Sequence, residues 1–437
     1  MSHFFQPDPA PTLLKNVRAI DPAAGLDSVG DVLILGDRVE FAPKSVPAGT
    51  QEIDATGLWA MPGLVDLQVH FREPGFEHKE TIETGSRAAF AGGITSVVVM
   101  PNTKPTMDTA ESVKNQTRLS DAVSGVNIMV AAAATRDIAG HELTDIAAMK
   151  AAGAVAITDD GYPLTDSATM KRALIACAEN NLLFMQHAED LALSRHGAMT
   201  ESPVCEALKL TGQSADAEGV MVEHDVALAV EVGARYHVLH MSTQRSMNAV
   251  REARAKGGRI TCETSPHHLM LTYDACAGGD PNFKMNPPLR SEADRLAMVE
   301  GLVDGTIDAV ATDHAPHGAD EKARGFQDAP FGVIGLETAF ATVLHFFHEG
   351  AISRTRAVEL MTSGPARVLD MSDELGTFGS RGDLALVDPS AAWTLKPEDL
   401  HGKQKNSSFL NREFKGRVVG TWQKGSLRYS LNDLRKS

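Results

Sequence analysis

The sequence predicts a (β/α)8 barrel with a smaller β-rich domain beside it. Short apolar runs alternate with longer helical stretches through the middle of the chain, which is typical of a parallel sheet built from βαβ units. Eight such runs are present, the number of strands in this barrel. Both ends of the chain have the pattern of short strands instead. A length of 437 residues accommodates a barrel of about 250 residues and a second, smaller domain.

Each of the eight runs is short, apolar and bounded by turn residues. They span Gly63–Phe71, Ile94–Asn102, Val126–Thr135, Ala154–Asp160, Leu182–His187, Tyr236–Ser242, Arg259–Ser265 and Ile307–Pro316. An open doubly wound sheet is the alternative arrangement, and it usually has a glycine-rich phosphate-binding turn after its first strand. Here the first run is followed by HFREPGF, so the barrel is favoured.

The two ends of the chain predict one composite domain formed where the termini meet. Apolar or alternating runs separated by turn residues predict these strands: Leu13–Ile20, Asp31–Leu35, Arg38–Phe41, Asp383–Val387 and Arg417–Trp422. Neither end is long enough to form a domain alone. We therefore expect residues 1–62 and 371–437 to form the small β domain and residues 63–370 to form the barrel.

Composition indicates which kinds of binding partner and which cellular compartment are favoured. A formal net charge of -16 disfavours nucleic acid and anionic membranes, although local Arg and His residues still allow a small anionic substrate. No run of 18 apolar residues predicts a membrane span, and the N-terminus lacks the pattern of a signal peptide. The four cysteines show no CxxC pairing. These features predict a cytoplasmic protein with reduced thiols.

Polar residues that can bind ligands or take part in catalysis recur at the ends of the predicted strands, where a barrel places its active site. They are Gln68, His70 and Arg72 in the first run, Asn102 in the second, Asp160 in the fourth, His187 in the fifth, His240 in the sixth, and Asp313 with His317 in the eighth. Each alone has an ordinary explanation, such as a turn or a helix cap. Their recurrence at five strand ends favours a metal site, and a set of His and carboxylate ligands suits zinc.

Several segments resemble the motifs of dihydroorotases. DLQVHFREPG at 66–75 is similar to D-x-H-x-H-x-R-[ED]-P-G, and VVVMPNTKP at 97–105 is similar to the M-P-N-T segment of that family. Further segments match in order: AITDDG (156–161), MQHAED (185–190), HVLHMST (237–243), FKMNPPLR (283–290), ATDHAPH (311–317) and APFGVIGLET (329–338). The resemblance is greatest to the bacterial type I branch, in which an Asp replaces the carboxylated Lys of many amidohydrolases. Hydantoinases and allantoinases, a less favoured reading, usually carry that Lys.

The resemblance implies roles for these residues. His70, Asp160, Asp313 and the residue at 68 would hold one zinc ion, and Asp160, His187 and His240 would hold a second. The substrate would be bound by His70, Arg72, Asn102, Asn286, His317, Phe331 and Gly332. Asp313 would also shuttle the proton.

The implied reaction is the reversible cyclisation of N-carbamoyl-L-aspartate to (S)-dihydroorotate in pyrimidine biosynthesis. In the hydrolytic direction, a zinc-activated hydroxide would attack the cyclic amide, because a bound metal lowers the pKa of water from 15.7 to about 7. A nearby carboxylate would transfer the proton to the leaving nitrogen. Arg72 offers a planar donor fork for the free carboxylate of the substrate.

Gln68 departs from the family pattern, which has a histidine at this position. A neutral amide oxygen is a poorer zinc donor than imidazole, so we expect a weak or absent ligand here and stronger binding at Asp160, His187 and His240. The alternative is a weakened or inactive homologue that serves as a structural partner of aspartate transcarbamoylase. Homo-oligomer formation is also compatible with the resemblance. Retention of the other predicted ligands favours the enzyme.

Overall fold

A computed structural model describes residues 3–8, 10–379 and 381–432 and contains a barrel of eight parallel strands. The strands are β7 (Leu64–Val69), β8 (Ile94–Val99), β9 (Asn127–Ala133), β10 (Ala154–Thr158), β11 (Leu183–Gln186), β14 (Arg235–Val238), β15 (Arg259–Thr264) and β16 (Ala309–Val310). Each pairs with its neighbour in chain order. A parallel bridge between Val69 and His314 joins the first strand to the segment after the last one. The predicted barrel is therefore confirmed, and each of the eight predicted runs contains part or all of a strand.

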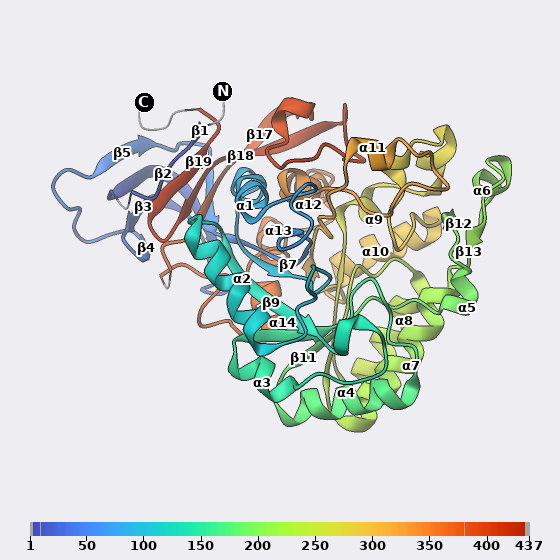
Figure 1. Cartoon of the computed structure of the whole chain (residues 1–437). Coiled ribbons are helices and arrows are strands. Elements are labelled where there is room, and N and C mark those ends of the chain that lie inside the picture. The colour runs from blue at the N-terminus through green and yellow to red at the C-terminus, as the bar shows by residue number, and fades with distance from the viewer. Residues whose placement is uncertain (1–2, 9, 380, 433–437) are drawn as a thin grey trace.

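Helices follow the strands and cover the outside of the barrel (Figure 1). The described residues form α1 (Ile82–Ala91), α2 (Ala110–Ala122), α3 (Ile146–Ala151), α4 (Ser167–Glu179), α5 (Leu191–Ser194), α6 (Pro203–Ala207), α7 (Asp216–Val232), α8 (Gln244–Ala255), α9 (Pro266–Met270), α10 (Glu292–Asp304), α11 (Ala319–Lys322), α12 (Ala339–His348), α13 (Arg354–Glu359) and α14 (Ser363–Leu369). Many begin at a side-chain cap: Thr81, Asp166 and Ser291 each accept a hydrogen bond from a backbone N–H of the first turn.

Alternation of side chains along the strands divides the apolar core into two parts. Residues such as Leu67, Val98 and Met185 fill the barrel interior. Their neighbours, including Val97 and Phe184, face outward against the helices. The inward positions at the carboxyl ends of the strands are polar instead, and they leave a site open at that mouth.

The second sheet joins both ends of the chain, as predicted. Its strands are β1 (His3–Phe4), β2 (Thr12–Asp21), β3 (Leu26–Leu35), β4 (Arg38–Phe41), β5 (Gln51–Asp54), β6 (Trp59–Pro62), β17 (Leu384–Thr394), β18 (Glu413–Gln423) and β19 (Ser426–Ser430). N-terminal β6 pairs with C-terminal β17, and β1 pairs with β19, so the sheet lies beside the barrel with both chain ends near it (Figure 1). The domain boundaries after residues 62 and 370 remain a prediction.

One segment connects this sheet to the barrel mouth and is important below. Between β17 and β18, residues 395–412 leave the sheet and run along the barrel. There the backbone N–H of Lys403 donates to the buried Glu80 carboxylate, and Asn406 contacts the segment after β16. Among the described residues, no helix has the length and apolar character needed to cross a membrane.

Candidate active site

A cavity of about 260 Å³ opens at the carboxyl ends of the barrel strands. Its lining includes the predicted residues His70, Arg72, Asn102, Asp160, His187, His240, Asn286, Asp313, His317, Phe331 and Gly332. Gly161, Tyr162 and Ala315 complete the lining and were not predicted. Gln68 lies beneath the cavity and is fully buried. Residues from distant parts of the chain thus meet at one mouth.

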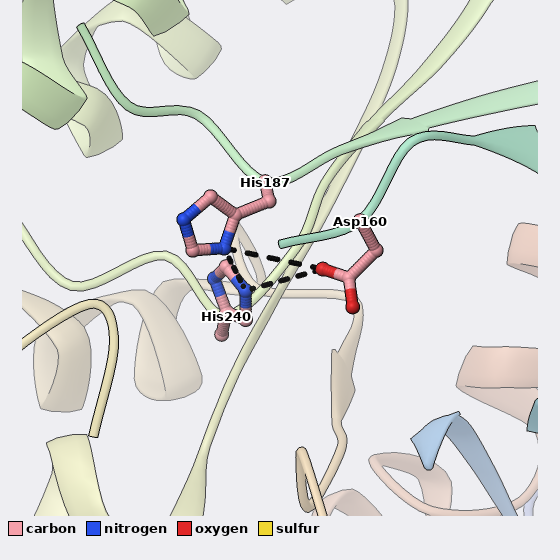
Figure 2. Close-up of side chains that lie close together, drawn as sticks. All are labelled: Asp160, His187 and His240. Carbon is pink, nitrogen blue, oxygen red and sulfur yellow. Dashed lines mark hydrogen bonds and ion pairs between the residues drawn. The ribbon is translucent and has the colours of Figure 1, made fainter. Parts of the chain in front are cut away.

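The centre of the site is formed by Asp160, His187 and His240, which converge from the ends of three strands (Figure 2). All three side chains are buried, and one potential ligand atom from each lies within 4.8 Å of the others. Nδ1 of His187 and Nε2 of His240 are 2.9 Å apart, and both face Oδ1 of Asp160 at 3.9 and 3.8 Å. Two imidazoles and a carboxylate converging in this way form a metal-binding group.

Next to this group, His70 contacts the other predicted ligands. Its Nδ1 lies 2.9 Å from Oδ1 of Asn102, an oxygen that only accepts, so Nδ1 carries the proton. Its Nε2 lies 3.1 Å from Oδ1 of Asp313 and 3.3 Å from Oδ2 of Asp160. In the neutral ring, a nitrogen lone pair would therefore face two carboxylates.

This charge arrangement tests whether the residues fit a metal ion. A lone pair on Nε2 of a neutral His70 ring would point at the oxygens of Asp160 and Asp313, so a positive charge between them, either a metal ion or a proton, makes the contact favourable. Nε2 of His187 lies 3.1 Å from Glu189 Oε2, and donation there turns the Nδ1 lone pair toward His240 and Asp160. Nδ1 of His240 is buried and has no hydrogen-bond partner among the described residues. The donor set and its orientation fit a divalent cation.

Electrostatics within the cluster keep its central carboxylate ionised. Burial alone would raise the pKa of Asp160, but the hydrogen bond from His240 and the charges of three histidines hold that pKa well below its ordinary value. For His187, burial lowers the pKa, yet Glu189 and the carboxylates of Asp160 and Asp313 raise it overall. The Asp160 carboxylate is thus ionised and can bind a cation.

Gln68 takes part in this cluster as a hydrogen-bond donor. Its Nε2 donates to Oδ1 of Asp160 over 3.1 Å, while its Oε1 is buried and has no hydrogen-bond partner among the described residues. The amide NH₂ group therefore occupies the side of Asp160 where a ligand atom would be needed. An NH₂ group has no lone pair to offer a metal, so Gln68 would have to turn its amide to become a ligand, and the weak or absent ligand at this position stays a prediction.

Arg72 lines another part of the cavity wall, beside His317. Nη2 of Arg72 lies 3.4 Å from Nε2 of His317, and Lys79 Nζ lies 3.3 Å from Nδ1 of the same ring. Burial, followed by the charges of Arg72 and Lys79, lowers the pKa of His317 to about 2, so the ring is neutral. Nε of Arg72 is buried without a hydrogen-bond partner among the described residues, which leaves a guanidinium donor available for an anion. A ligand with a negative end is favoured on this side.

Asn286 and Glu189 form a polar bridge at the third side of the cavity. Nδ2 of Asn286 donates to Glu189 Oε2 over 2.8 Å and lies 3.2 Å from Nε2 of His187. Its Oδ1 accepts from Gln213 over 3.3 Å. Glu189 was missed by sequence reasoning, although it lies two residues after His187 and its carboxylate orients that ring. Asn286 therefore holds the Glu189 carboxylate that orients His187, as well as lining the cavity.

Three non-glycine residues of the site have backbone conformations with positive φ: Arg72 at 61°, His240 at 30° and Asp313 at 47°. Non-glycine residues adopt this region at a cost of about 1–3 kcal/mol when the conformation is strained. Buried carboxylates hold the flanking backbone: Asp66 accepts from the N–H groups of Gln68 and Thr312. Such strain is typical of sites where side-chain direction matters for function.

Asp159 and Asp66, two further carboxylates near the strand ends, bind backbone groups. Asp159 accepts from the backbone N–H groups of Ala134 and Thr135, so of the two adjacent aspartates only Asp160 belongs to the cluster. Asp66 accepts from the backbone N–H of Thr312 and supports the backbone of the site. His268 bonds the Pro287 carbonyl and has a packing role.

Solved structures with this arrangement are cyclic amidohydrolases. The L-hydantoinase of Arthrobacter aurescens superposes with a TM-score of 0.84 at 25% identity, over 95% of both chains. The dihydropyrimidinase of Brevibacillus agri has a similar fold, with a TM-score of 0.83 at 22% identity over 95% of this chain and 94% of that one. The fold and the His- and Asp-lined mouth define the chain as a member of this amidohydrolase class of enzymes.

Sequence relatives narrow the class. The family model described as "Dihydro-orotase-like" matches residues 57–246. A protein named dihydroorotase from Solibacter usitatus is 44% identical over 422 residues, covering 96% of this chain and 98% of that protein. Another from Syntrophotalea carbinolica is 41% identical over 422 residues, covering 96% and 99%. The chain belongs to the dihydroorotase family.

Proposed function

We propose that the protein is a dihydroorotase, which interconverts N-carbamoyl-L-aspartate and (S)-dihydroorotate. The observation that carries the proposal is the polarity of the cavity: the cluster around Asp160 faces the guanidinium of Arg72 and the ring of His317 across one small space. The substrate has a matching polarity, with a reacting cyclic amide and a free carboxylate. Family membership supports the same reaction.

We propose zinc as the metal, held mainly by Asp160, His187 and His240. Such an ion would supply Lewis acidity, which polarises a carbonyl and lowers the pKa of water to about 7. Arg72 then binds the substrate carboxylate through its planar fork, and His317 adds a second contact beside it. Asn102 orients the His70 ring through Nδ1. Phe331 and Gly332 close the cavity over the substrate.

Asp313 is placed to move the proton that this reaction needs. It lines the cavity, and its Oδ1 is 3.1 Å from Nε2 of His70. In hydrolysis, water adds to the amide carbonyl, the C–N bond breaks, and the nitrogen gains a proton. Asp313 accepts the proton from the water and returns it to the nitrogen; cyclisation reverses these steps.

A hydantoinase is the second candidate, favoured by the similarity to solved hydantoinase structures. The sequence places Asp160 where the resemblance implies a carboxylated lysine in hydantoinases, and the cationic wall at Arg72 suits a substrate with a carboxylate. A non-catalytic partner of aspartate transcarbamoylase has no need of the convergent ligands. The dihydroorotase is therefore the better candidate.

The test is turnover of dihydroorotate by the purified chain, measured with added zinc and after chelation. We expect ring opening with zinc and loss of activity on chelation, with hydantoin turned over far more slowly. Hydantoin turnover in preference to dihydroorotate would reject the proposed substrate. An inactive protein with bound zinc would favour the non-catalytic alternative.

Arg72→Lys tests how the substrate is recognised. Lysine keeps the charge but loses the bidentate fork, so kcat/KM for dihydroorotate should fall by about tenfold or more, equivalent to about 1.4 kcal/mol or more. Arg87→Lys is the matched control, because Arg87 is half-exposed and pairs with Glu83 on α1. Steady-state kinetics of both variants give the answer, and an unaffected Arg72→Lys enzyme would mean that the carboxylate is held elsewhere.

A further inference from the structure

Two chain segments form the wall of the cavity beside Arg72, and they separate close to the substrate space. One follows β16 and carries Ala315 and His317; the other carries Phe331 and Gly332. They pair only briefly, through the bridge between His314 and Val333 and a hydrogen bond from Ala315 N to Val333 O of 2.8 Å. Beyond that point, another group must hold them together.

The side chain of Asn406 fills this position. It comes from the segment between β17 and β18 and is 5% exposed. Its Oδ1 accepts from the N–H of His317 over 3.3 Å, and its Nδ2 donates to the carbonyls of Ala315 and Gly332, both over 3.2 Å. The backbone carbonyl of Asn406 also accepts from Ile334 N over 3.2 Å. One amide thus bonds both walls.

Packing at this point allows little displacement. Gly332 has a φ of +124°, and a Cβ on it would lie 2.7 Å from Cβ of Ala315 and 3.2 Å from Nε2 of His317. The two segments therefore approach so closely that no side chain fits on residue 332 between them. A shift of Gly332 would displace the ring that lies beside Arg72.

The opposite side of the same segment is fixed by two buried lysines. Nζ of Lys322 donates to the carbonyls of Pro281, Lys284 and Pro330, over 3.0, 3.2 and 3.0 Å. Nζ of Lys284 lies 4.5 Å from the centre of the Phe331 ring. These contacts attach the Phe331 segment to the 281–284 segment. They do not reach Ala315 or His317. Nδ1 of His314 accepts from Gly335 N over 3.4 Å further from the cavity, and the Asn406 side chain connects Ala315 and His317 to Gly332 beside it.

We propose that Asn406 is a positioning residue that sets the distance between His317 and Gly332, and thereby the shape of the subsite for the substrate carboxylate. The inference rests on the proposed function for its choice of substrate. It assigns a role in substrate binding to a segment that belongs to neither the barrel strands nor their helices. Asn406 does not itself touch the substrate.

Asn406→Asp tests the proposal with almost no change in size. The variant keeps an oxygen for the N–H of His317 but places a second oxygen against the carbonyls of Ala315 and Gly332. We expect KM for dihydroorotate to rise by about tenfold, because small displacements of binding groups have large kinetic effects. We expect kcat to stay within about threefold and the zinc content to be unchanged, since the metal cluster is untouched.

Gln404→Glu is the matched control. It makes the same amide-to-acid change two residues away, where Nε2 of Gln404 donates to the carbonyl of His78. Its KM should equal that of the wild type. A purely structural role for Asn406 would lower the melting temperature of Asn406→Asp without a change in KM, and that result would overturn the proposal.

Asn406→Ser and hydrogen exchange keep the test decisive if the Asp variant folds poorly. Serine is neutral and retains one donor, so we expect a smaller rise in KM in the same direction. Amide exchange in peptides covering 313–318 and 330–335 should accelerate in both variants and not in Gln404→Glu. This readout needs no substrate, so an inactive wild type would reject the proposed function while exchange still decided the role of Asn406. Unchanged exchange with unchanged KM would reject the role.

Discussion

Asp313→Asn is expected to reduce kcat by about 10²–10⁴-fold, the range in which a positioned general base contributes. The amide has the same size but cannot accept a proton from water and return it to the leaving nitrogen. Asp313→Ala should lose as much activity. Both effects follow from the position of Asp313 in the cavity, with Oδ1 3.1 Å from His70 Nε2. The measurement is steady-state turnover of dihydroorotate in both directions.

Two controls separate loss of chemistry from loss of structure. Asp320→Asn makes the same change at an exposed position on α11 and should leave kcat unchanged. Zinc content and melting temperature of Asp313→Asn should stay close to the wild type, because Asp160, His187 and His240 remain in place. If Asp313→Asn retained most of its activity, Asp313 would have no part in proton transfer.

Hydrophobic periodicity was sufficient to predict the barrel, since each strand is an apolar run bounded by turn residues. It overestimated the last strand: the run 307–316 contains only β16 (Ala309–Val310). The backbone at Asp313 takes a φ of 47°, which interrupts the strand before the bridge at His314. The same conformation turns a polar side chain toward the cavity. Strand length was therefore predicted least well where the chain serves the site.

The small sheet was only partly predicted for a different reason. β1, with two residues, and β5 and β6, with four each, were not predicted, although β4 of the same length was. Their place in the sheet depends on pairing across the chain, as β6 pairs with β17 more than 300 residues later. Such pairing depends on the tertiary structure, because local sequence does not specify a partner strand.

The site itself was predicted from polar residues at the ends of the strands. The residues that were missed lie outside the strand ends. Glu189 follows its strand by a few residues, and its spacing from His187 was the available sign. Asn406 lies in an irregular segment 89 positions after His317, with no periodic pattern near it. Its role depends on contacts with two backbone segments, and composition and spacing do not encode these.

Gln68→His is expected to add a bound zinc ion beside His70, Asp160 and Asp313. In the wild type, Gln68 directs its NH₂ group at Oδ1 of Asp160, so we expect about one tightly held ion per chain, at the group containing His187 and His240. Imidazole in place of the amide supplies a lone pair. We expect zinc affinity at the added position to rise by at least about 10–100-fold. Loss of a residue that only hydrogen-bonds to a metal ligand already lowers metal affinity by this factor.

Metal analysis and calorimetric titration of zinc into the metal-free protein measure this effect. Gln68→Met is the matched control, because it has similar length and removes the NH₂ group without adding imidazole; it should not gain the ion. Activity should rise with the second ion if dihydroorotate is the native substrate. An inactive wild type rescued by Gln68→His would instead indicate a silenced enzyme. Two tightly held ions in the wild type would show that Gln68 does not weaken the site, since the amide would then have to turn its oxygen toward the metal.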